Sequence, residues 1–207
     1  MTLVGKFINE KAHAKRLSPR AWLEEQRAQA SAPFELFVAV IIMSFVVIVG
    51  YQALEKVNTE VCLNTVDREM TKFKVSLEDT VVRKSQNKLF FSPDERCVSS
   101  KGTVMKIEFE NDKAVCSARC NYPSDGCYVM TFSNPNIANA FKQKCLDLPP
   151  YTNFVNDCTP GVGYSDYMPI NPMDEGQIKM GSYVFSNISP AGDTYPKICV
   201  FYKAGGS

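Results

Sequence analysis

Eight cysteines are the residues of widest chemical range in this sequence, since a cysteine can form a disulfide, bind a metal or act as a nucleophile. They all lie in the last three quarters of the chain: Cys62, Cys97, Cys116, Cys120, Cys127, Cys145, Cys158 and Cys199. An even count confined to one part of the chain predicts up to four disulfides in an oxidising compartment. Eight cysteines can pair in on the order of 100 ways, so the connectivity stays open.

Metal binding and enzymatic catalysis are the alternatives to disulfides. Cys116, Cys120 and Cys127 form the tightest cluster, but the chain lacks the CxxC pairs typical of structural zinc sites and thioredoxin-like redox sites. The single histidine is His13, far from this cluster in the sequence. We therefore expect no metal, no cofactor and no enzymatic activity. The nearly balanced charge also lacks the basic excess of a nucleic-acid-binding protein.

A long apolar segment, Pro33–Leu54, organises the rest of the chain. From Leu36 to Leu54 it has 19 residues without a charge, most of them Val, Ile, Phe, Leu or Met. As a helix this run covers about 28 Å, close to the ~30 Å hydrocarbon thickness of a bilayer. The sequence therefore predicts a single transmembrane helix over residues 33–54.

The charges flanking this segment predict its orientation. Residues 1–33 hold six Lys and Arg residues against three Glu, whereas residues 55–207 hold 17 basic and 18 acidic residues. The more basic flank of a membrane helix stays in the cytoplasm. We expect a cytoplasmic N-terminus (residues 1–32) and an extracellular head, which also agrees with the placement of the cysteines.

The helix is expected to continue beyond the membrane through residues 55–86, because no Gly or Pro interrupts residues 52–84. An apolar stripe at helical spacing runs along this part: Leu63, Val66, Met70, Phe73, Leu77 and Val81. Charged residues such as Glu69 and Lys72 are expected to lie off the stripe. The stripe is either the face that packs on the head or the seam of a coiled coil; fewer than three heptads favour packing.

The remaining residues, 87–207, alternate short apolar runs with turn signals. Strands are expected at 88–91, 103–109, 113–117, 127–132, 178–185 and 197–202, a short helix at 135–146, and a long loop at 149–175 held by Cys145 and Cys158. The predicted fold class is α+β: a long N-terminal transmembrane helix that continues into an amphipathic helix packed on a small, mainly antiparallel, disulfide-rich β head. Asn187 begins a possible N-glycosylation sequon, Asn187-Ile188-Ser189, although a surface turn explains the same residues.

Two features remain near the membrane segment. Residues 20–27 suggest a short helix with Ser18 as its N-cap and Pro19 at its first position, and the alternative is an unstructured or loosely helical tail. Glu35 is an unusual residue for the start of an apolar span. It could lie at headgroup level, where a first-turn carboxylate suits the helix dipole.

The stretch QASAPFELFVAVIIMSFVVIVG (residues 29–50) resembles the N-terminus of type IV pilins and of archaeal pilin-like proteins with class III signal peptides. In that family a prepilin peptidase removes a basic leader, and the glutamate at the fifth mature position pairs with the amino group of a neighbouring subunit. The resemblance implies cleavage between Ala30 and Ser31, which makes Glu35 the fifth residue. The archaeal variant would instead place the cut before Gln29.

From this resemblance we expect a single-pass, cell-surface structural subunit. Its partners would be the lipid bilayer, further copies or other pilin-like subunits joined through the hydrophobic helix, and a prepilin peptidase. The alternative, from a different class, is a membrane-anchored extracellular binding or adhesion domain that forms no filaments.

Overall fold

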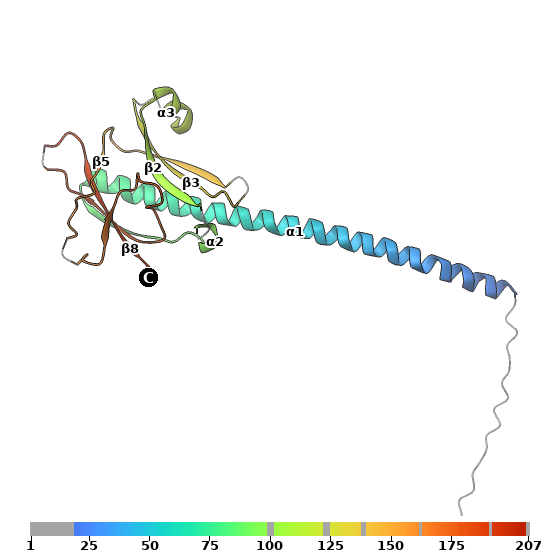
Figure 1. Ribbon diagram of the computed structural model, residues 1–207. Helices are drawn as coiled ribbons and strands as arrows, with labels where there is room; N and C mark the ends of the chain where they lie inside the picture. The colour runs from blue at the N-terminus through green and yellow to red at the C-terminus, as the bar shows by residue number, and fades with distance from the viewer. Residues whose placement is uncertain are drawn as a thin grey trace, which may run out of the picture. The chain divides into compact units, whose positions relative to one another are not determined.

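One helix, α1 (Pro19–Arg83), makes up 65 residues of the protein (Figure 1). The computed structural model describes residues 19–98, 102–121, 125–137, 140–161, 163–190 and 192–205, with side chains from residue 33 onward. Pro19 takes the first helical position, where its missing N–H costs no hydrogen bond. The short helix expected at 20–27 is therefore the beginning of α1, because the mainly Ala residues that follow favour helix, and Pro33 lies inside it.

The chain divides into two compact units between Leu54 and Glu55, where the sequence changes from apolar to amphipathic. In the second unit, α1 ends at Arg83, and Lys84 follows with a left-handed φ of 51°. A left-handed residue is a common helix terminator, since it turns the chain out of the helical path. The strands begin two residues later.

Two sheets form the rest of the second unit, and their strands follow the helix along the chain (Figure 1). The larger sheet has the order β1-β7-β8-β5, with β6 also paired to β8: β1 (Gln86–Phe91), β5 (Asn153–Phe154), β6 (Met168–Ile170), β7 (Gly181–Asn187) and β8 (Lys197–Ala204). The smaller sheet has the order β2-β3-β4: β2 (Val104–Glu110), β3 (Cys127–Ser133) and β4 (Phe141–Leu146). All pairings are antiparallel except β5 with β8. The prediction of an α+β fold with mainly antiparallel strands is confirmed.

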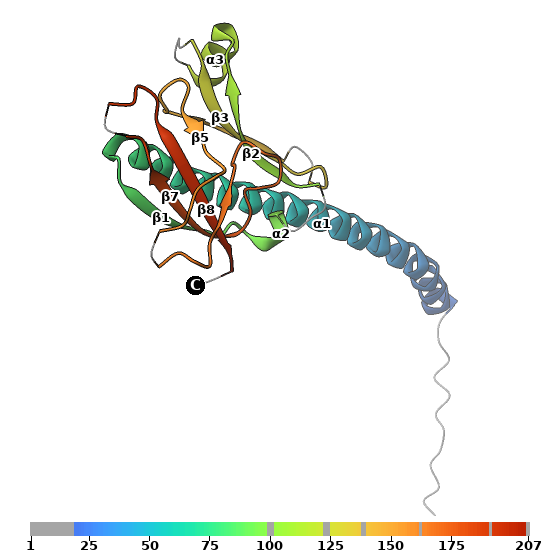
Figure 2. The same cartoon turned by 60° about the vertical axis from the view of Figure 1, so that its left-hand side comes forward.

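The core of the second unit contains side chains from α1 and from both sheets. Val66, Met70, Phe73 and Leu77 are fully buried on α1. They share one apolar cluster with residues of β2, β3, β7 and β8. The Phe73 ring meets Phe185 edge to face at 4.9 Å between centroids, and β1, β7 and β8 lie side by side along this part of α1 (Figure 2). Burying side chains of this size stabilises the fold by about 1.5–3 kcal/mol each.

The strand expected at 113–117 is wrong, because these residues belong to a helix, α3 (Lys113–Cys120). Asp112 caps it: its carboxylate accepts hydrogen bonds from the backbone N–H groups of Ala114 (2.8 Å) and Val115 (3.3 Å). Cys116 and Cys120, four residues apart, fall on the same face of α3 and reach neighbouring strands. That spacing was a helical signal.

The helix expected at 135–146 is also wrong. Residues 141–146 form β4, which pairs with β3 from Phe141↔Ser133 to Leu146↔Tyr128. The Asn134 side chain, just before this segment, accepts from the N–H of Asn136 and donates to the carbonyl of Cys97 (2.7 Å). Pairing with β3 overrides the local helical preference, as tertiary context often does for short segments. A second short helix, α2 (Glu95–Val98), was not predicted.

The long loop expected at 149–175 contains two short strands, β5 and β6, which both pair with β8. Cys145 and Cys158 do tie this region down, but to partners outside it, Cys120 and Cys199.

Candidate functional site: the apolar segment of α1 and Glu35

The apolar part of α1 in the first unit exposes its side chains on every side. Among the large hydrophobic residues from Phe34 to Leu54, exposed fractions run from 37% at Val38 to 70% at Met43. In the described part of the chain, α1 is the one helix long and apolar enough to cross a membrane. Exposing a continuous apolar surface of this size to water is energetically unfavourable, so a membrane or a partner must cover it.

Glu35 lies at the start of this surface, and its side chain is exposed. It is the 17th residue of α1, counted from Pro19. The helix dipole acts within the first turn only. In the intact chain it therefore cannot stabilise Glu35, and that part of the headgroup interpretation is wrong.

No charged partner for Glu35 lies among the side chains that the structure describes, since their ion pairs all involve residues from Asp67 onward. Ser31 is one helical turn before Glu35, and Ala30 precedes it. Both are helical in backbone, while their side chains lie outside the described residues. A carboxylate inside a membrane needs a compensating cation. If Glu35 lies within a membrane, the compensating charge must come from a group that is not among these described side chains.

The eight cysteines form four disulfides: Cys62–Cys97, Cys116–Cys127, Cys120–Cys145 and Cys158–Cys199. The expectation of full pairing is confirmed. Since Cys116, Cys120 and Cys127 are all bridged, none is a thiolate ligand. Among the described residues no group of three His, Cys, Asp or Glu side chains is placed to hold a metal ion.

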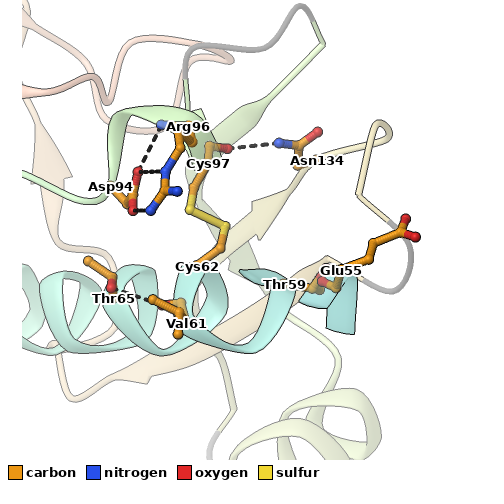
Figure 3. The surroundings of a disulfide bond; sticks show 9 residues. All are labelled: Glu55, Thr59, Val61, Cys62, Thr65, Asp94, Arg96, Cys97 and Asn134. Atoms are coloured by element: carbon orange, nitrogen blue, oxygen red, sulfur yellow. Dashed lines mark hydrogen bonds and ion pairs between the residues drawn. A yellow bond between two sulfur atoms is a disulfide. The ribbon is translucent and has the colours of Figure 1, made fainter. Parts of the chain in front are cut away.

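The Cys62–Cys97 disulfide joins α1 to α2 (Figure 3). Around it, Asn134 donates to the Cys97 carbonyl, and Arg96 binds the Asp94 carboxylate through two nitrogens, at 3.1 and 2.7 Å. The hydrogen bond from Arg96 lowers the pKa of Asp94 below its usual value. The connection between β1 and β2 is thus fixed to the helix by a covalent bond and held by local polar contacts.

Asn187, the possible glycosylation residue, is the last residue of β7. Its side-chain nitrogen donates to the carbonyl of Val81 at 3.3 Å, and its oxygen accepts from the N–H of Ser189 at 3.0 Å. The nitrogen that a glycan would modify thus already satisfies a carbonyl in the last turn of α1.

Glu69 is a residue that sequence analysis placed wrongly. Its side chain is 2% exposed, although it was expected off the apolar stripe. One carboxylate oxygen accepts from Lys72 Nζ at 2.7 Å and from Arg68 Nε at 3.3 Å, and the other accepts from the N–H of Ser92 at 3.4 Å. Glu69 lies three residues after Val66 and four before Phe73, so helical spacing places it beside the buried face.

No family model, curated protein or solved structure matches this chain.

Proposed function

We propose that this protein is a single-pass, cell-surface structural subunit of the pilin-like type, which assembles through its hydrophobic N-terminal helix. The observation that carries the proposal is the exposed apolar segment of α1 with one carboxylate, Glu35, at its start. The other unit of the same chain is an α+β domain with four disulfides.

The proposed orientation places residues 1–32 in the cytoplasm and the head outside the cell. It is supported by the basic excess before the apolar segment. It is also supported by the position of every disulfide after that segment, since disulfides persist outside the cytoplasm. The amphipathic part of α1 would then be the element on which the head is built.

Assembly would give Glu35 its missing charge partner. If a prepilin peptidase hydrolyses the bond between Ala30 and Ser31, Ser31 acquires a free amino group that is positively charged at neutral pH. That group, supplied by a neighbouring subunit, would pair with Glu35 inside the lipid. The role is structural, and the proposal requires no catalysis by this chain.

N-terminal sequencing of the membrane-extracted protein tests the processing step. The proposal expects a start at Ser31. A start at Gln29 would keep the pilin-like role but remove Glu35 from the fifth position. An intact N-terminus in cells that possess the peptidase would contradict the proposal and favour an anchored binding domain.

Replacement of Glu35 tests the assembly step. Glu35→Ala should lower the number of surface filaments at least tenfold, as counted by quantitative electron microscopy. The monomer should stay in the membrane with its disulfides intact. The matched control is Glu55→Ala, because Glu55 is the first carboxylate after the apolar segment and is also exposed. Equal filament numbers in the wild type and in Glu35→Ala would show that Glu35 takes no part in assembly.

A further inference from the structure

A second surface of interest lies on the head, in the turn Pro149–Thr152. The N–H of Thr152 donates to the carbonyl of Pro149 at 3.2 Å and closes the turn. Pro150 takes the second position, and Tyr151 takes the third with a φ of 62°. Turns of this pattern place Gly or Asn at the third position, because a side chain there is strained. A tyrosine at this position breaks the local rule.

The Tyr151 side chain does not compensate for that strain by burial, since 64% of the residue is exposed. Its ring meets the ring of Tyr195 edge to face, with centroids 5.3 Å apart and planes at 73°. Tyr195 is itself 50% exposed. Strained residues that the fold holds in place are common at functional sites. The two rings are therefore candidates for contact with a partner.

Strand pairing places the two tyrosines side by side. Strand β5 pairs with β8 in parallel, with Asn153 opposite Lys197, and the N–H of Asn153 donates to the carbonyl of Pro196 at 2.8 Å. Tyr151 and Tyr195 each precede the paired residues by two positions, so the parallel register brings them together. The buried hydroxyl of Tyr128 also donates to the carbonyl of Thr152 at 2.8 Å. Such preorganisation lowers the entropy lost on binding.

The chemistry of the pair points to a carbohydrate. Each exposed ring offers an electron-rich face and a hydroxyl at its edge. A sugar ring has the complementary character, with a face of C–H groups and a rim of hydroxyls. Asp193 and Lys197, two residues before and two residues after Tyr195 in the sequence, form an ion pair at 3.0 Å whose oxygen and nitrogen atoms can bind sugar hydroxyls. Because the rings stand nearly at right angles, they do not form the flat aromatic-lined groove that proline-rich peptides use.

We propose that Tyr151 and Tyr195 form a carbohydrate-binding surface on the head, which takes a neutral sugar unit of an oligosaccharide. This proposal does not depend on whether the helix assembles, since every residue it uses lies in the second unit. It adds a recognition role to the proposed structural one.

Binding of soluble hexasaccharides to the full chain in detergent tests the proposal. Maltohexaose, cellohexaose and chitohexaose serve as probes, with saturation-transfer NMR as the readout. At least one should bind saturably, and Tyr195→Ala should weaken that binding at least tenfold. The matched control is Phe141→Ala, because Phe141 is an aromatic residue on β4 whose exposed fraction, 56%, is close to that of Tyr195. This substitution should leave sugar binding unchanged.

Tyr151→Gly separates recognition from structure. Glycine suits the left-handed position, so the variant should keep its Tm within about 4 °C of the wild type yet lose sugar binding at least tenfold. A larger fall in Tm would show that Tyr151 serves the fold. The proposal is also overturned if no probe binds, if Tyr195→Ala binds like the wild type, or if only a polyproline peptide binds in a Tyr195-dependent way.

Discussion

At the scale of single residues, two buried tyrosines tie loops to the core through their hydroxyls. Tyr128 donates to the Thr152 carbonyl, and Tyr183 donates to the Lys179 carbonyl while accepting from the Lys179 N–H at 2.7 Å. Burial raises the pKa of Tyr128 to about 12 and raises the pKa of Tyr183 as well. Both groups stay protonated in the folded protein at pH values where an unfolded chain has lost the proton.

This difference predicts a loss of stability at alkaline pH. The stabilisation is complete below the ordinary tyrosine pKa of about 10 and falls as pH rises towards the folded pKa, because the unfolded state then binds fewer protons. For Tyr128 the loss should be on the order of 2–3 kcal/mol between about pH 10 and 12. Urea denaturation followed by circular dichroism at several pH values measures it.

Tyr128→Phe is the control for the alkaline effect. It should lower the unfolding free energy by about 1 kcal/mol at pH 8, since the Thr152 carbonyl loses its donor. Its stability should then depend less steeply on pH above 10 than that of the wild type. Identical slopes for the two proteins would exclude Tyr128 as the source.

Glu69 and Glu35 illustrate how far residue types alone can be interpreted. The burial of Glu69 follows from its spacing to Val66 and Phe73, but its charge suggested exposure. Only the fold shows the groups that compensate this charge, which are Lys72, Arg68 and the N–H of Ser92. Glu35 could be singled out from the sequence because it is a charged residue at the start of an apolar segment. Its partner could not be found, since on our proposal that partner belongs to another copy of the chain.

At the scale of elements, secondary structure could be predicted where the spacing of apolar residues indicates a buried face. The apolar stripe of α1 and five of the strands follow such patterns, and each contributes buried residues to the core. The prediction at 135–146 was wrong because β4 takes its structure from pairing with β3. The prediction at 113–117 missed two local helix signals, the Asp112 cap and the four-residue spacing of Cys116 and Cys120.

The buried face of α1 makes a quantitative prediction for the head. Phe73→Ala should lower the unfolding free energy by about 3–5 kcal/mol, because the cavity would open among Phe91, Tyr183 and Phe185. Val75→Ala, two residues away and 56% exposed, should change it by less than about 0.5 kcal/mol. Urea denaturation of the full chain in detergent compares them. Similar losses in both variants would mean that α1 does not bury this face in the head.

At the scale of the whole molecule, two contrasting units share one chain. The second unit satisfies its own apolar and polar groups: the described residues contain no buried side-chain nitrogen or oxygen atom without a hydrogen-bond partner. The first unit does not, because the apolar side chains of its α1 segment, residues 33–54, all stay exposed. The head therefore has a core of its own, whereas the apolar segment needs a membrane or a partner to cover it, which on our proposal are lipid and further subunits.

The central claim, that copies of this chain meet through the apolar part of α1, is tested most directly by photo-crosslinking in the cells that make the protein. A benzoylphenylalanine in place of Met43, which is 70% exposed, should give a light-dependent ladder of covalent oligomers of this chain. The same group in place of Phe141, on the head, serves as the comparison for random encounters. A Met43 sample that contains only monomer, or no more oligomer than the Phe141 sample, would contradict the account.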